Sequence, residues 1–194
     1  MIHIPENCNK INVMISGGAD SAILLFLLLK QTNGQIPIKV FTFEDIVNIN
    51  LNSVNLKATK SVLSWLESYF NTKIPFQIIK KRMYIRRAVE DIWLTEGGYV
   101  YTGCNKVLYD EISPTVYIPG DTPPVRGEPF SDIHLRPFID VTKVDIVRLY
   151  LEHNVLDLLK LTNSCGAPNP PCGGCYFCLE RKWAVDQLGI ADTV

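Results

Sequence analysis

Segments typical of β-strands alternate with helical segments along the first half of the chain, and this order restricts the fold more than any other feature. The expected strands cover residues 11–15, 36–43, 74–79 and 99–102, and the expected helices cover residues 22–30, 62–70 and 84–94. Strands connected by helices run parallel, and the helices cover both faces of the sheet. The sequence therefore predicts an α/β fold with a parallel sheet between helices.

The second half of the chain is less regular. Residues 113–137 are rich in proline and predict a long loop. Thr142 and Asp145 have the spacing of a capping box, which predicts that a helix over residues 143–153 begins there. A last helix is expected over residues 179–188.

Length and composition indicate a globular protein. The 194 residues, 47% hydrophobic and 20% charged, favour one domain over residues 1–194, with a cysteine-containing C-terminal segment over residues 160–194. The longest apolar run, residues 22–29, is too short to cross a membrane. A net charge of −1 gives no general attraction for a nucleic acid, so we do not expect nucleic acid as a partner. We recognise no export signal and expect a cytoplasmic location.

A glycine turn, Ser16-Gly17-Gly18-Ala19-Asp20-Ser21, joins the first expected strand to the first expected helix. Glycines let successive backbone N–H groups converge on an anion, and the start of a helix adds positive potential. The turn lacks the Lys-Ser/Thr pair of a Walker A loop and the third glycine of a dinucleotide fingerprint. It predicts a phosphate site of another type, or a tight turn that serves only the path of the chain.

Four of the six cysteines lie within a short stretch, at Cys165, Cys172, Cys175 and Cys178. Four thiolates at this density are typical of a tetrahedral zinc site, which is structural because no position is left for water. An iron–sulfur cluster is the main alternative, because the last three cysteines share the two-residue spacing of ferredoxins. Disulfides or free thiols are the remaining interpretation.

The glycine turn resembles the SGGxDS loop of the PP-loop ATP pyrophosphatases. Four other stretches are similar to the 7-cyano-7-deazaguanine synthase family, namely residues 102–105, 135–147, 164–165 and 171–181. The resemblance implies a Rossmann-like PP-loop fold of the adenine nucleotide alpha hydrolase-like type, and an ATP-dependent carbon–nitrogen ligase. Such an enzyme adenylates 7-carboxy-7-deazaguanine and converts it with ammonia, through the amide, to the nitrile, releasing pyrophosphate. One structural zinc, ATP with Mg²⁺, and a homodimer are also implied.

The resemblance assigns roles to individual residues. ATP is expected to contact the glycine turn, the end of the second strand and the turn after the fourth, through Ser16, Gly17, Gly18, Asp20, Ser21, Thr42, Phe43 and Gly103. Asp20 is the nearest candidate ligand for Mg²⁺. Lys143 is expected to be a cation near the phosphates, and Arg181 to meet a carboxylate or phosphate of the substrate. The alternatives are a solvated lysine in the first turn of a helix and an arginine on a helix surface.

The chain departs from the family in two regions that bear on the substrate. Glu44-Asp45-Ile46 follows the second strand where relatives carry Asp-Tyr-Gly-Gln, and a proline-rich stretch, residues 117–132, replaces the expected Tyr-Pro-Asp-Cys-Arg region. Two alternatives therefore remain open. One is a divergent enzyme that passes the adenylated intermediate to another amine or to sulfur, in protein conjugation or tRNA thiolation. The other is a zinc-stabilised module that binds a nucleotide without catalysis.

Overall fold

Five parallel strands form the central sheet of the computed structural model, which describes residues 1–44, 49–80, 85–106, 131–165 and 171–191. The spatial order is β3 (Phe76–Lys80), β2 (Ile38–Glu44), β1 (Ile11–Met14), β4 (Tyr99–Thr102) and β5 (His134–Leu135). Each of the four pairings is parallel. The predicted parallel α/β sheet is confirmed.

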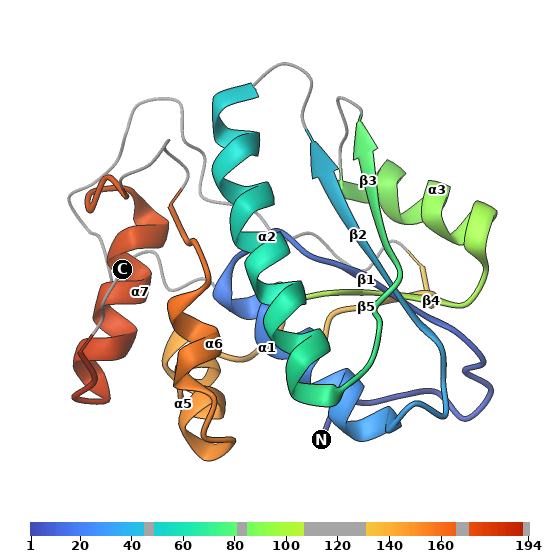
Figure 1. The fold of residues 1–194 in the computed structure, drawn as a ribbon, viewed down its shortest axis with the longest axis horizontal. Helices are drawn as coiled ribbons and strands as arrows, with labels where there is room; N and C mark the ends of the chain where they lie inside the picture. The colour runs from blue at the N-terminus through green and yellow to red at the C-terminus, as the bar shows by residue number, and fades with distance from the viewer. Residues whose placement is uncertain (45–48, 81–84, 107–130, 166–170, 192–194) are drawn as a thin grey trace.

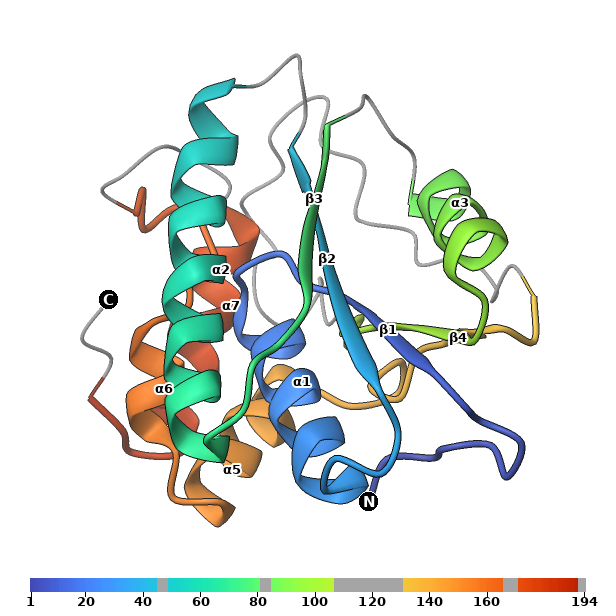
Figure 2. The ribbon, with the colours of Figure 1, turned by 45° about the vertical axis from the view of Figure 1, so that its right-hand side comes forward.

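Helices cover both faces of this sheet. Figure 1 and Figure 2 show α1 (Ala19–Thr32) and α2 (Ile49–Phe70) on one face and α3 (Ile85–Glu96) on the other. Neighbouring residues of a strand point to opposite faces. In β1, Val13 accordingly belongs to the large core shared with α1 and α2, whereas Met14 belongs to a smaller core shared with α3. With both faces of the sheet covered, all four residues of the central strand β1 are buried.

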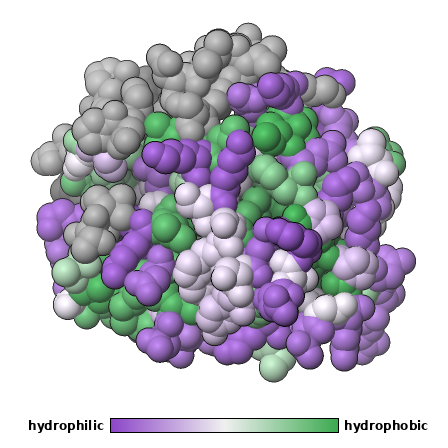
Figure 3. All heavy atoms as spheres, viewed as in Figure 1, coloured by the Kyte–Doolittle hydropathy of each residue, from purple (hydrophilic) through white to green (hydrophobic). Residues whose placement is uncertain are grey.

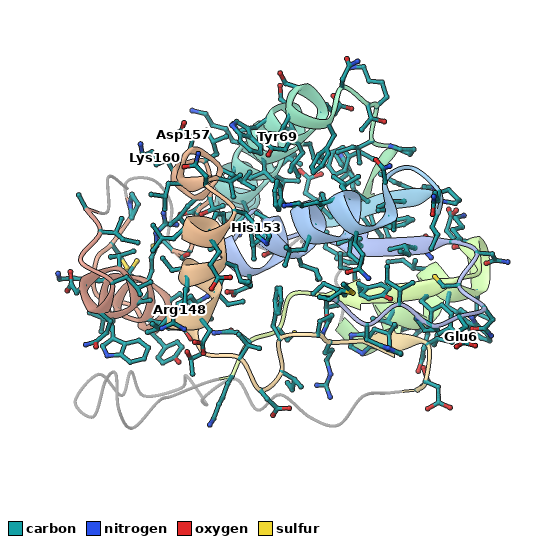
Figure 4. All side chains as sticks on the ribbon, turned by 90° about the horizontal axis from the view of Figure 1, so that it is seen from below. Glu6, Tyr69, Arg148, His153, Asp157 and Lys160 are labelled. Atoms are coloured by element: carbon teal, nitrogen blue, oxygen red, sulfur yellow. The ribbon has the colours of Figure 1, made fainter. Side chains whose placement is uncertain are left out.

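Of three further helices, α5 (Lys143–Glu152) and α6 (Leu156–Lys160) pack against α1, and α7 (Tyr176–Gln187) packs against α5. Their buried apolar residues join the large core. Seen from below in Figure 4, His153 at the end of α5 lies beside α1, and its ring is 5.5 Å from that of Phe26.

The surface in Figure 3 is mainly hydrophilic, with separate apolar patches between the polar side chains. Among the described residues, no helix has both the length and the apolar character that crossing a bilayer requires.

The structure departs from the predicted elements where local sequence carries little signal. The two-residue strand β5 lies within residues 113–137, which we expected to be a loop, and pairing of Val100 with His134 places it at the sheet edge. Such a short strand has no periodicity, because only tertiary pairing defines it. Residues 113–130, most of that expected loop, lie outside the described residues. Helix α6 was not expected, and α2 begins well before residue 62.

Candidate functional site

A cavity of about 430 Å³ opens at the carboxyl ends of β1, β2 and β4. This is where the strand order reverses, between β1 and β4, and ligands of open α/β sheets bind at such positions. The cavity is lined by most of the residues that we expected to contact ATP or take part in catalysis: Ser16, Gly18, Asp20, Ser21, Thr42, Phe43, Gly103 and Lys143. Gly17 and Arg181 do not line it. One cavity thus brings together residues from four separate parts of the chain.

The glycine turn leaves the first amides of α1 open to the cavity. Gly18 is the N-cap of α1 and has no side-chain cap, so N–H groups of the first turn are available to an anion. The Ser21 hydroxyl donates to the Gly18 carbonyl at 3.1 Å and accepts from the Ser16 amide at 3.2 Å, which fixes the shape of the turn. Gly17 has a φ of +80°, and a Cβ there would lie 2.6 Å from the Asn55 carbonyl oxygen. Gly17 therefore shapes the turn without facing the cavity.

Lys143 forms an ion pair with Asp20 at the cavity wall. Its Nζ lies 2.6 Å and 2.7 Å from the two carboxylate oxygens of Asp20, and 3.2 Å from Oε2 of Glu180. Lys143 is the first residue of α5, after the predicted capping box of Thr142 and Asp145, which is present. With 4% of its side chain exposed, Lys143 is not a solvated lysine of the first turn.

Arg181 faces the protein interior. Its guanidinium donates to the carbonyl and hydroxyl oxygens of Thr162 and to the carbonyl of Leu159, at distances of 2.8–3.2 Å. These acceptors lie at and just beyond the end of α6, where cations are favourable. Arg181 is 4% exposed, so it is neither the surface arginine of one interpretation nor, in this arrangement, at the cavity.

The ends of β2 and β4 are fixed against the glycine turn. The Thr42 hydroxyl donates to the Ile15 carbonyl at 2.8 Å. A Cβ at Gly103 would lie 2.6 Å from the Ser21 amide nitrogen, so only glycine permits this approach of β4 to α1. At the end of β4, the Thr102 hydroxyl lies 2.9 Å from Nε2 of His134 in the neighbouring strand β5. Burial lowers the pKa of His134 to about 4.

Asn163 connects the glycine turn to the cysteine loop, the segment from Cys165 to Cys178 of which the structure describes residues 165 and 171–178. The sequence did not predict this role. The backbone N–H of Asn163 donates to the Gly17 carbonyl at 2.8 Å, and its side-chain Nδ2 donates to Asn55 Oδ1 at 2.9 Å. The same side chain accepts from the Cys165 amide at 3.2 Å. Its position just before Ser164-Cys165 was the only available signal.

The four cysteines converge as predicted. Their sulfur atoms all lie within 4.8 Å of one another, and those of Cys165 and Cys172 are 3.5 Å apart. Sulfurs bound at about 2.3 Å to one tetrahedral ion would be separated by about 3.8 Å. In a four-iron cluster each cysteine binds a different iron, which spreads the sulfurs further. Backbone amides, with that of Gly174 foremost, lower the pKa of Cys172 to about 6 and so favour its thiolate. The cluster can therefore hold one metal ion.

Cys165 also lines the cavity, together with Phe177 of α7. The cysteine loop is thus one wall of the cavity, and the glycine turn is another. The sequence predicted both motifs but not that they share a cavity.

Comparison with known proteins gives limited similarities. No protein-family model matches the chain. A stretch of 96 residues, 49% of the chain, is 35% identical to 7-cyano-7-deazaguanine synthase of Archaeoglobus fulgidus, and it covers 36% of the length of that protein.

Among solved structures, the chain is similar to the U34-tRNA thiolase NcsA from Methanococcus maripaludis with its [4Fe-4S] cluster, at 17% identity and a TM-score of 0.47. That alignment covers 92% of this chain and 65% of the thiolase. The NH3-dependent NAD synthetase from Campylobacter jejuni, in complex with the nitrate ion, gives 16% identity and a TM-score of 0.47, with coverage of 80% and 69%.

Proposed function

We propose that this protein is an ATP-dependent ligase that adenylates a carboxylate, with 7-carboxy-7-deazaguanine as substrate and ammonia as nucleophile. The observation that carries the proposal is the single cavity shared by the open first turn of α1, Asp20 and Lys143. The 35% identity to 7-cyano-7-deazaguanine synthase over half of the chain supports the choice of substrate. The homodimer expected from the same resemblance is part of this proposal.

The residues suggest how the reaction would proceed. Amides of the first turn of α1 and the Ser16 hydroxyl bind the β and γ phosphates of ATP. A carboxylate oxygen of the substrate attacks the α phosphorus, and pyrophosphate leaves. Lys143 stabilises the negative charge that develops on the phosphates. Ammonia then attacks the acyl adenylate, AMP leaves, and loss of a proton gives the amide. A second ATP adenylates the amide oxygen, and loss of AMP and the two N–H protons gives the nitrile.

Two metal ions are part of the proposal. Asp20 is the only acidic residue among the described residues that line the cavity, so it would bind the Mg²⁺ that accompanies ATP. The four cysteines would bind one zinc ion, an assignment that the sulfur separations described above support. This ion would not take part in the reaction.

A product assay tests the proposal. Purified metal-loaded protein is incubated with ATP, Mg²⁺, 7-carboxy-7-deazaguanine and ammonia, and nucleotides and deazaguanines are identified by mass spectrometry. We expect AMP, pyrophosphate, the amide and the nitrile. Asp20→Asn should reduce AMP formation by about 100-fold or more. Asp186→Asn, the same chemical change at an exposed ion pair on α7, should have no effect.

Sulfur at the cavity favours one other acceptor. Cys104, which is not one of the four clustered cysteines, lines it, so a thiol is present where sulfide from an external donor would displace AMP from an adenylated substrate. If the assay yields AMP only when a tRNA and a sulfur donor are present, the acceptor is sulfur and the deazaguanine substrate is excluded. If the protein binds ATP but no AMP forms with any acceptor, it is a nucleotide-binding module without catalysis.

A further inference from the structure

Glu180 is a buried carboxylate that no part of the proposed reaction uses. It lies on α7, two residues after Cys178, and its side chain is 2% exposed. Its partners lie on two other elements and on its own helix: Lys143 at the start of α5, Asn105 in the turn after β4, and Tyr176 in the first turn of α7. A buried charge is costly unless it is paired and hydrogen-bonded, as Glu180 is.

The two oxygens of Glu180 have different partners. Oε1 accepts from Nδ2 of Asn105 at 2.9 Å and from the hydroxyl of Tyr176 at 3.2 Å. Oε2 lies 3.2 Å from Nζ of Lys143. One oxygen is therefore held by neutral donors, and the other is directed at the ammonium group.

The two acids beside Lys143 also differ in their access to the cavity. Asp20 lines the cavity, and 19% of its side chain is exposed. Glu180 does not line it. A cation that enters with ATP can reach Asp20 but not Glu180. When Asp20 turns to that cation, Lys143 loses its nearer partner, and a buried ammonium without a counter-charge is strongly disfavoured.

We propose that Glu180 is a positioning residue that holds Lys143 at the cavity wall once Asp20 has bound the magnesium ion of the nucleotide. The inference rests on the proposed function, because it assigns ATP and Mg²⁺ to this cavity. Glu180 touches neither substrate nor ion; it acts through Lys143. Without it, Lys143 depends on Asp20 alone and competes with Mg²⁺ for that carboxylate.

The test uses Glu180→Gln in the full-length metal-loaded protein. Gln can keep the oxygen that accepts from Asn105 and Tyr176, so the change removes mainly the ion pair with Lys143. We expect the concentration of Mg²⁺ for half-maximal binding of an ATP analogue, measured by calorimetry, to rise about 10-fold. In the product assay kcat should fall by about 10- to 100-fold, whereas KM for ATP at saturating Mg²⁺ should change little.

Two comparisons separate this role from a structural one. Asp186→Asn removes an exposed acid from the same helix and should leave the Mg²⁺ dependence unchanged. In a Lys143→Met background, adding Glu180→Gln should change neither the Mg²⁺ dependence nor kcat, because the ammonium that Glu180 positions is gone. If Glu180→Gln alone does not fold, a Mg²⁺ dependence of the double variant that differs from that of Lys143→Met would still overturn the role.

The outcomes are distinguishable from failure of the proposed function. If the unmodified protein neither binds the ATP analogue with Mg²⁺ nor forms AMP, the proposed function fails. If it does both and Glu180→Gln has the same Mg²⁺ dependence and kcat, the role of Glu180 is overturned. An equal effect of Glu180→Gln with and without Lys143 would overturn it as well.

Discussion

The two walls of the cavity are held in place by different means. The glycine turn follows a buried strand, and backbone and hydroxyl hydrogen bonds fix its shape. In the described part of the cysteine loop, the backbone amides of Cys172 and Cys175 donate to the sulfurs of Cys165 and Cys172, and Cys172 is exposed. The four sulfurs of the cysteine loop lie close enough together to bind one ion. Hydrogen bonds within the turn fix the first wall, whereas those described within the second run to the sulfurs themselves, so an ion bound to these sulfurs would stabilise the second wall most.

The largest expected effect comes from removing the metal that we propose at the four cysteines. A chelator strong enough to strip it should lower the melting temperature by about 10 °C, which for a chain of this size is roughly 3–5 kcal/mol. Calorimetry with and without chelator measures this, and readdition of zinc should restore the original value. An unchanged melting temperature after verified metal loss would mean that both walls are held by the fold.

Acid should lower the stability of the fold through His134, which lies in the edge strand β5. The pKa of His134 is about 4 in the folded protein because of burial, against about 6.5 unfolded. The unfolded chain therefore binds the proton more tightly. The neutral His134 therefore favours the folded state most above pH 6.5. As the pH falls toward 4, the free energy of unfolding decreases by up to about 3 kcal/mol.

Urea unfolding at a series of pH values measures this slope. His134→Gln keeps a partner for Thr102 and should flatten the slope, which separates His134 from His153, whose pKa burial also lowers. A slope that is identical in the variant would show that His134 does not carry it.

An exchange of the two buried cations should separate catalysis from stability. Arg181→Lys cannot reach Thr162 and Leu159 with two nitrogens, and should cost about 2–3 kcal/mol of unfolding free energy while kcat of the folded enzyme changes little. Lys143→Arg keeps the charge between Asp20 and Glu180 but changes its shape, and should lower kcat more than stability. Chemical denaturation and the product assay measure the two effects; a large loss of kcat in Arg181→Lys would contradict the interior placement of Arg181.

The smallest expected effect compares one glycine from each wall. Gly17 and Gly173 both have positive φ, so Ala is strained at either position. Only at Gly17 does the added Cβ also meet backbone, 2.6 Å from the Asn55 oxygen. Gly17→Ala should therefore cost about 1–2 kcal/mol more than Gly173→Ala in urea unfolding. Equal costs would show that the glycine turn is less tightly enclosed than its contacts indicate.

Much of the fold follows from the sequence because its signals are local. Periodicity, the glycine turn and the Thr142–Asp145 capping box are each contained in a few residues, and the structure has the corresponding elements. The two-residue strand β5 and the short helix α6 depend on contacts with distant segments. No local pattern could have predicted them.

The site shows the same division. The four cysteines lie close in sequence, so their convergence was predictable. The residues around Arg181 in the sequence do not indicate whether its side chain faces a substrate or the end of α6. Only tertiary packing determines which of the two it contacts. The roles of Glu180 and Asn163 arise from contacts with segments up to 146 residues away, such as that between Asn163 and Gly17.

Asn163 makes the two walls thermodynamically dependent on each other. The residue bonds Gly17 through its backbone and Cys165 through its side chain, so neither loop can shift without straining this residue. Linkage works equally in both directions. If a metal ion at the cysteines raises the affinity for nucleotide by some factor, bound nucleotide raises the affinity for the metal ion by the same factor. The protein would therefore release the ion most readily when no nucleotide is bound.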